Sequence, residues 1–197
     1  QKLVENTNLI KWYTQNLSHK WTKMVPLPIG LDLHTDSKLS HFSGLKTQFQ
    51  KSFDKPWSDR RNMIYADCVL NCTSRTRAQL KRKLLNDPNR FFVPSERQSH
   101  SGLLKSYSRH RFVLSVEGNG IDCHRTWEAI LCGCIPLVSN KLILSDDLEQ
   151  FVIRVDQWSD LFETSFQDDL NNFKRSNLSF DDTLEKLDLA KRLIQSN

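Results

Sequence analysis

The glycine-rich turn before residue 122, and the helix expected after it, have the residue types and spacing best suited to chemistry. Gly118, Asn119 and Gly120 form the turn, and Asp122 is a natural N-cap for the helix. The two glycines let the backbone approach a ligand without a Cβ in the way. Because the N–H groups and dipole of a helix N-terminus favour an anion, we expect the turn to contact a phosphate.

Arg125 and Glu128 extend this expectation to a nucleotide. Arg125 places a planar guanidinium in the first helical turn, where it can grip two phosphate oxygens. Glu128 follows on the same face about 4.5 Å further along the axis, an offset that resembles the step from a diphosphate to its ribose. The alternative is an Arg125–Glu128 ion pair on a solvated surface, which contributes roughly a few tenths of a kcal/mol.

A dinucleotide fingerprint is the competing interpretation of the turn, since Gly118 and Gly120 follow an expected strand and precede a helix. The third glycine is replaced by Cys123, and the next strand runs into Ser139 and Asn140 instead of an acid. The sequence therefore disfavours an NAD site.

Weaker candidates lie at other expected strand ends. Glu117 either contacts the donor sugar or acts as a base, or else it holds the turn by bonds to backbone N–H groups. Arg75 and Arg77 open a helix and are candidates for phosphate contacts, or else they are ordinary exposed arginines. Asn71 and Ser74 are candidate caps of that helix.

Three further polar residues complete the candidate set. His124 is a possible donor to a phosphate, or else a half-exposed structural histidine. If the first lobe is native, Asp32 and His34, which follow Pro28 and Gly30, would face the cleft, and they are candidates to bind an acceptor or to act as a base.

Short apolar runs alternate with helical patterns after residue 62, and these elements must position the candidate residues. Strands are expected over residues 64–70, 90–93, 111–116, 134–138 and 151–155, and helices over residues 76–85, 101–109, 123–132 and 184–194. Such alternation predicts an α/β fold with a Rossmann-like parallel sheet flanked by helices, whose ligands bind beyond the carboxyl ends of the strands.

The N-terminal residues do not show this alternation of strands and helices. Residues 9–13 look helix-like or irregular, residues 23–29 look like a strand, and residues 31–59 form a polar connection with an amphipathic piece over 45–53. We expect residues 1–58 to be the remnant of an N-terminal lobe with a linker. Residues 59–180 then form a Rossmann-like, ligand-binding lobe, and residues 181–197 a closing helix.

The run from Glu117 to Val138, EGNGIDCHRTWEAILCGCIPLV, resembles the exostosin-like glycosyltransferases, whose signature joins an Arg-x-x-Glu-Ala helix to a Gly-Cys-Ile-Pro strand. The similarity is specific in this block and looser over the rest of residues 12–158. It implies a GT-B fold, a UDP-linked sugar as donor, and an inverting transfer to a glycan acceptor without a cofactor or an essential metal. By the match, Arg125 holds the diphosphate and Glu128 the ribose, with Cys134 to Pro136 under the nucleotide.

The sequence departs from the family pattern in its N-terminal lobe, which is short because only about fifty residues precede the second lobe. The first interpretation is therefore an inverting glycosyltransferase, with UDP-xylose as the first donor to test. The alternative is a non-catalytic nucleotide-sugar-binding module that lacks a complete acceptor site.

Charge and composition exclude other classes. The net charge is +5, but its basic residues are spread between acids, which disfavours a nucleic-acid partner. The sequence contains no Asp-x-Asp motif, and its five cysteines match no zinc-site spacing. Since no apolar run reaches the roughly 18 residues of a membrane span, we expect no direct membrane insertion. The sequence does not indicate a cellular compartment.

Overall fold

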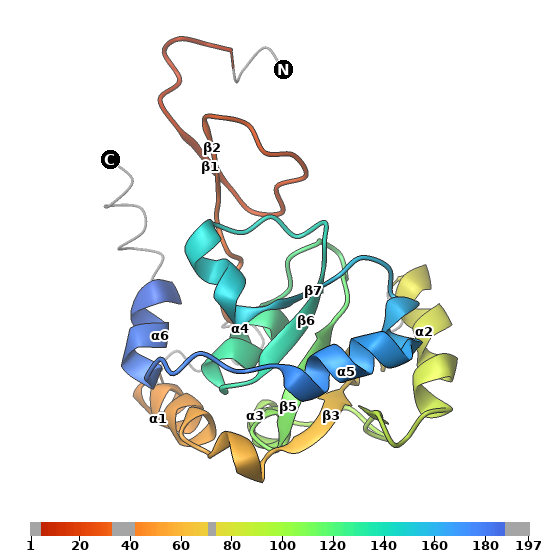
Figure 1. The fold of residues 1–197 in the computed structure, drawn as a ribbon. Coiled ribbons are helices and arrows are strands. Elements are labelled where there is room, and N and C mark those ends of the chain that lie inside the picture. Colours follow the sequence, from red (N-terminus) through yellow and green to blue (C-terminus); the bar gives the residue numbers. More distant parts are fainter. Residues whose placement is uncertain (1–4, 33–41, 71–73, 188–197) are drawn as a thin grey trace.

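A five-stranded parallel sheet with helices on both faces forms the body of the molecule in the computed structural model, which describes residues 5–32, 42–70 and 74–187 (Figure 1). The strands are β3 (Arg61–Tyr65), β4 (Phe91–Phe92), β5 (His110–Ser115), β6 (Ile135–Ser139) and β7 (Ile153–Val155). Each neighbouring pair is parallel. The expected α/β class and Rossmann-like sheet are thus confirmed.

The direction in which the chain builds the sheet reverses between β3 and β5. The spatial order is β4-β3-β5-β6-β7, so the chain adds β4 on one side of β3 and then returns to add β5, β6 and β7 on the other. Two neighbouring strands whose connections diverge leave a crevice at their carboxyl ends, which is where open α/β sheets bind ligands.

The helices are α1 (Phe42–Phe53), α2 (Arg75–Leu85), α3 (His100–Tyr107), α4 (His124–Leu131), α5 (Thr164–Asn172) and α6 (Phe180–Leu187). Short 3-10 helices are η2 (Trp57–Asp59), η3 (Asp67–Val69), η4 (Asp146–Phe151) and η5 (Asp160–Phe162). Within the described ranges, no helix is both long enough and apolar enough to cross a membrane.

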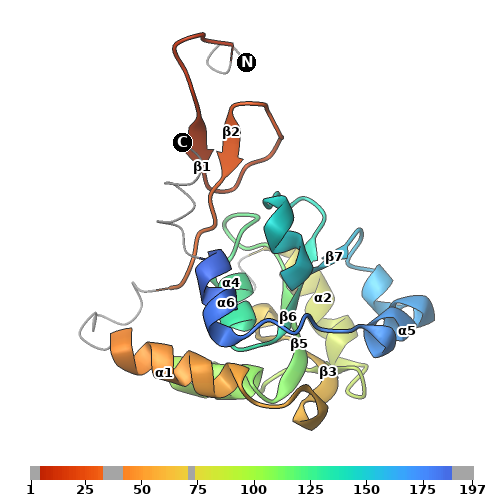
Figure 2. The same cartoon turned by 60° about the vertical axis from the view of Figure 1, so that its left-hand side comes forward.

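Both faces of the sheet are covered (Figures 1 and 2). Ile64 and Leu114 point to the face that packs against α2 and α5. Tyr65 and Val113 point to the opposite face, where Phe49 of α1 joins residues of α3, α4 and α6. Because alternate residues of a strand face opposite sides, burial of both sides requires the nearly continuous apolar runs seen in the sequence. Helix α1 therefore belongs to the layers around the sheet.

Two elements of the body of the molecule differ from what the sequence predicted. The strand expected over 64–70 begins instead at Arg61 and ends at Tyr65, and the apolar residues after it form η3. An apolar run marks burial but does not separate a strand from a buried turn. Helix α5 was not expected, because only Phe166 and Leu170, one helical turn apart, pack into the core.

A small parallel ribbon precedes the main sheet and stands out from it (Figures 1 and 2). It consists of β1 (Trp12–Thr14) and β2 (Met24–Pro26). A strand at β1 contradicts the helix-like or irregular segment expected there, and the aromatic and β-branched side chains of β1 explain the difference. The strand expected over 23–29 is shorter than predicted.

His110, at the start of β5, makes the stability of the fold depend on pH. The side chain is 2% exposed, Nδ1 donates to the carbonyl of Ser106 at 2.7 Å, and Nε2 is buried with no partner among the described residues. Burial lowers the pKa of His110 below its ordinary value of 6.5, so the folded protein holds the neutral ring. The unfolded chain binds the proton first as the pH falls, and below about pH 6.5 stability is lost.

We expect the free energy of unfolding, measured in urea, to fall between pH 7.5 and 5.5 by up to about 1.4 kcal/mol per pH unit below 6.5 on account of this residue. His110→Asn, which keeps a donor for Ser106, should remove that part of the dependence. His19→Asn changes an exposed histidine and should leave the dependence as it is. Identical pH profiles for His110→Asn and the unmodified protein would contradict the assignment.

Candidate functional site

A cleft of about 1160 Å³ lies at the carboxyl ends of β3 and β5, where the strand order reverses. Its walls come from the segments that follow β3, β4 and β5, from the first turns of α3 and α4, and from α1. The cleft is large enough for a nucleotide sugar, since pockets for drug-sized ligands measure roughly 300–1,000 Å³. The candidate residues that line it are Asp32, Arg77, Gly118, Asn119, Gly120, Asp122, His124, Arg125 and Glu128.

Arg125 is held by a carboxylate from another strand end. Its Nε lies 2.9 Å from Oδ1 of Asp67 and its Nη2 lies 3.3 Å from Oδ2, so the guanidinium is bound along one edge. The side chains of Arg125 and Asp67 are 18% and 15% exposed. Although burial lowers it, the charge of Asp67 raises the pKa of Arg125 well above its usual value. The cation is permanent, and its Nη1 edge is left for a ligand.

Glu128 has its partner on α3. Its Oε1 lies 3.2 Å from Nε2 of His100, and its side chain is 6% exposed. The alternative interpretation of the sequence, an Arg125–Glu128 pair on a solvated surface, is wrong, because each side chain is largely buried and pairs with a different element. Two oppositely charged groups of one helix thus line the same cleft, each fixed by a partner from outside that helix.

Side chains of the protein itself lie against the two glycines of the turn. A Cβ at Gly118 would lie 2.8 Å from Nη2 of Arg77, and one at Gly120 would lie 2.5 Å from Oδ1 of Asn16. Both distances are shorter than real Cβ contacts. The space expected to admit a ligand beside these Cα atoms is therefore taken by two side chains of the chain itself, although the turn still lines the cleft.

Arg77 and Arg75 have different surroundings. The guanidinium of Arg77 is buried and donates to the carbonyls of Val116 at 2.8 Å and Glu117 at 3.1 Å, so it braces the turn after β5. Arg75 is exposed and is not part of the cleft wall. Ser74 caps α2 by accepting from the N–H of Arg77, as expected, whereas Asn71 lies outside the described residues.

Asp122 and His124 connect α4 to the segment after the ribbon. Asp122 is not the N-cap expected from the sequence: Cys123 occupies that position. The Asp122 carboxylate accepts from the N–H of Ile29 at 2.7 Å and from the indole of Trp127 at 2.8 Å. Burial raises the pKa of Asp122, although these hydrogen bonds oppose the shift.

His124 adds a second link, because its Nδ1 donates to the carbonyl of Gly30 at 2.8 Å. Asp32, two residues further, lies in the cleft wall. His34 lies outside the described residues.

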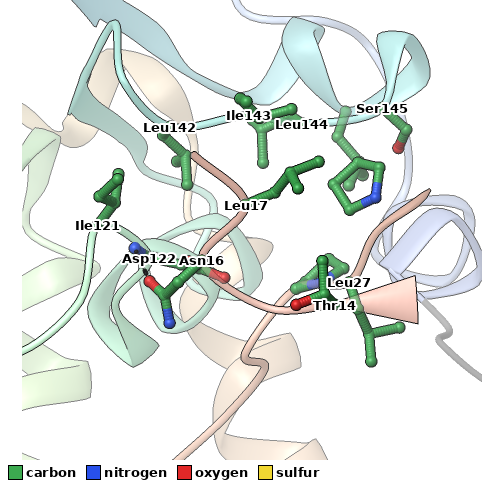
Figure 3. A pocket seen from close by; sticks show the side chains of 13 residues that line it. Thr14, Asn16, Leu17, Leu27, Ile121, Asp122, Leu142, Ile143, Leu144 and Ser145 are labelled. Atoms are coloured by element: carbon green, nitrogen blue, oxygen red, sulfur yellow. Dashed lines mark hydrogen bonds between the residues drawn. The ribbon is translucent and has the colours of Figure 1, made fainter. Parts of the chain in front are cut away.

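The base of the ribbon packs on the same turn around a second, much smaller cavity of about 10 Å³ (Figure 3). Leu17 and Leu27 meet Leu142 and Leu144 across it, and the carboxamide of Asn16 accepts from the N–H of Asp122 at 2.8 Å. A cavity of this size holds about one water. The ribbon is therefore joined to the sheet by apolar packing as well as by hydrogen bonds.

Glu117 is not part of the cleft wall. Its Oε2 accepts from the indole Nε1 of Trp158 at 3.1 Å, which accounts for a polar side chain at this strand end. The structure therefore brings Asp32, and not Glu117, to the cleft as a carboxylate that could take a proton.

Sequence reasoning missed the residues that hold the charged pair in place. Asp67 and His100 lie 58 and 28 positions away from their partners along the chain. Their places were not predicted either, because Asp67 fell inside the strand expected over 64–70 and His100 just before the helix expected over 101–109. In the structure Asp67 opens η3, after the end of β3, and His100 is the first residue of α3.

Neither a scan against protein-family models nor a search of the curated proteins found a match for this chain.

Proposed function

We propose that this chain is the nucleotide-sugar-binding lobe of an inverting, metal-independent glycosyltransferase of the GT-B type, as its resemblance to the exostosin-like enzymes implies. The observation that carries the proposal is that Arg125 and Glu128 line one cleft at the point where the strand order reverses. That point is where Rossmann-like sheets bind nucleotides.

In this proposal Arg125 and Glu128 contact different parts of the ligand. Arg125 and the N-terminal N–H groups of α4 face the diphosphate, whose leaving charge they stabilise. Glu128 accepts hydrogen bonds from the ribose hydroxyls. Asp67 and His100 are positioning residues, because they act through Arg125 and Glu128.

The transfer is a single displacement at the anomeric carbon. An acceptor hydroxyl forms a bond to that carbon while the bond to the diphosphate oxygen breaks, so the configuration inverts and UDP leaves. The proton of the hydroxyl goes to a carboxylate. Asp32 is the candidate base, since it lines the cleft and Glu117 does not.

The test is calorimetric titration with UDP, GDP, NAD and pyrophosphate, followed by assays with UDP-sugars, UDP-xylose first. We expect micromolar binding of UDP, weaker binding of GDP and no binding of NAD. Binding of UDP without turnover of any UDP-sugar would favour the alternative, a non-catalytic nucleotide-sugar-binding module. Absence of nucleotide binding would overturn both.

A further inference from the structure

Tyr107 has a hydroxyl group that the rest of the described chain does not use. The residue is completely buried, and its Oη has no hydrogen-bond partner among the described residues. Buried hydroxyl groups in proteins are nearly always paired, because an unpaired one loses its bonds to water and gains none. Tyr107 is nevertheless one of the residues that line the cleft of the candidate site.

The charged groups that act on this hydroxyl are those of the candidate site. Burial raises the pKa of Tyr107 well above its ordinary value, and Asp67 and Glu128 raise it further while Arg125 lowers it. The phenol therefore stays protonated and can donate a hydrogen bond. Asp67 is paired with the cation Arg125, so its charge is compensated when an anion enters, and Glu128 is held by Nε2 of His100 at 3.2 Å.

Neighbouring polar groups have partners already. Tyr65, whose ring packs edge-on against that of Tyr107 at 5.5 Å, directs its hydroxyl to Oε1 of Gln98 at 3.4 Å. The same oxygen accepts from Ser106 at 2.7 Å. These neighbouring groups therefore offer no acceptor to the hydroxyl of Tyr107 within the described residues.

We propose that Tyr107 is a ligand-binding residue whose Oη donates to a phosphoryl oxygen of the nucleotide, next to the free Nη1 edge of Arg125. The inference rests on the proposed function and adds a subsite to it. A phosphoryl oxygen fits better than a ribose hydroxyl, because a hydrogen bond to an anion is stronger than one to a neutral group and Arg125 supplies the cation. A ligand oxygen reaches the hydroxyl only when the side chains covering it move aside.

The test is Tyr107→Phe, which removes one oxygen and keeps the ring. We expect the affinities for UDP and for pyrophosphate, measured by calorimetry, to fall by the same factor of about ten. The melting temperature without ligand should not fall, because the deleted hydroxyl has no partner to lose. A hydroxyl that served the fold would instead lower the melting temperature and leave the affinities unchanged.

Tyr13→Phe is the matched control. Its hydroxyl is also buried and without a partner in the described part of the chain, but Tyr13 lies in β1 and not in the cleft wall. It should change neither affinity.

Three results would overturn the inference. Unchanged affinities in Tyr107→Phe would do so alone, leaving the proposed function in place. A loss for UDP but not for pyrophosphate would move the contact to the ribose. If the unmodified protein binds neither UDP nor pyrophosphate, the proposed function and the Tyr107 subsite are both wrong.

Discussion

Replacing Arg125 with alanine is expected to weaken UDP binding about a hundredfold, or by about 2.7 kcal/mol, because charge-assisted hydrogen bonds to the diphosphate are lost. The variant should also melt at a lower temperature, since Asp67 is left 15% exposed and without its cation. Calorimetry with UDP and a thermal melt measure the two effects separately.

The double variant Asp67→Asn/Arg125→Ala separates binding from folding. It should recover most of the melting temperature, because the uncompensated carboxylate is gone, and it should still fail to bind UDP. Arg75→Ala is the matched control, since this arginine is exposed and lies outside the cleft wall. Full UDP affinity in Arg125→Ala would show that the phosphate assignment is wrong.

Glu128→Gln is expected to weaken UDP about thirtyfold, which corresponds to about 2 kcal/mol, while the affinity for pyrophosphate changes little. The reason is that in the proposed complex the carboxylate accepts from both ribose hydroxyls, which pyrophosphate lacks, whereas an amide can accept with one oxygen only. The measurement is the ratio of the two dissociation constants, which cancels any general loss of folded protein.

Glu96→Gln provides the control for this substitution, because Glu96 also lines the cleft but is exposed. It should leave both constants unchanged. Equal losses for UDP and pyrophosphate in Glu128→Gln would count against a ribose contact and would place the carboxylate near the diphosphate instead.

The sheet could be predicted from the sequence because its signal is local and repeated. Apolar runs such as that around Val113, each followed by a helical pattern, have few solutions other than parallel strands with crossover helices. The placement of Arg125 and Glu128 on one face of a helix could be predicted for the same reason, since a spacing of three residues in one helix fixes their separation. Helix α5 was not readable, because it packs into the core mainly through Phe166 and Leu170.

The partners of the candidate residues could not be predicted, because they depend on which segments the fold brings together. Asn16 fills the space beside Gly120, although more than a hundred residues separate them. Asp122 has the residue type and position of a helix cap, yet its carboxylate is used by Ile29 and Trp127. A local rule describes what a side chain can do, whereas the tertiary structure decides which of several bonds it makes.

The contact between Arg125 and Asp67 also affects the entropy of binding. An arginine side chain free to rotate carries about 2 kcal/mol of conformational entropy, which a ligand that orders it must overcome. Here two hydrogen bonds to Asp67 restrict the guanidinium before any nucleotide arrives. The loss of rotational freedom accompanies folding of the chain. A phosphate bound as we propose would therefore meet a cation that is already oriented, and little of its binding free energy would be consumed in ordering the side chain.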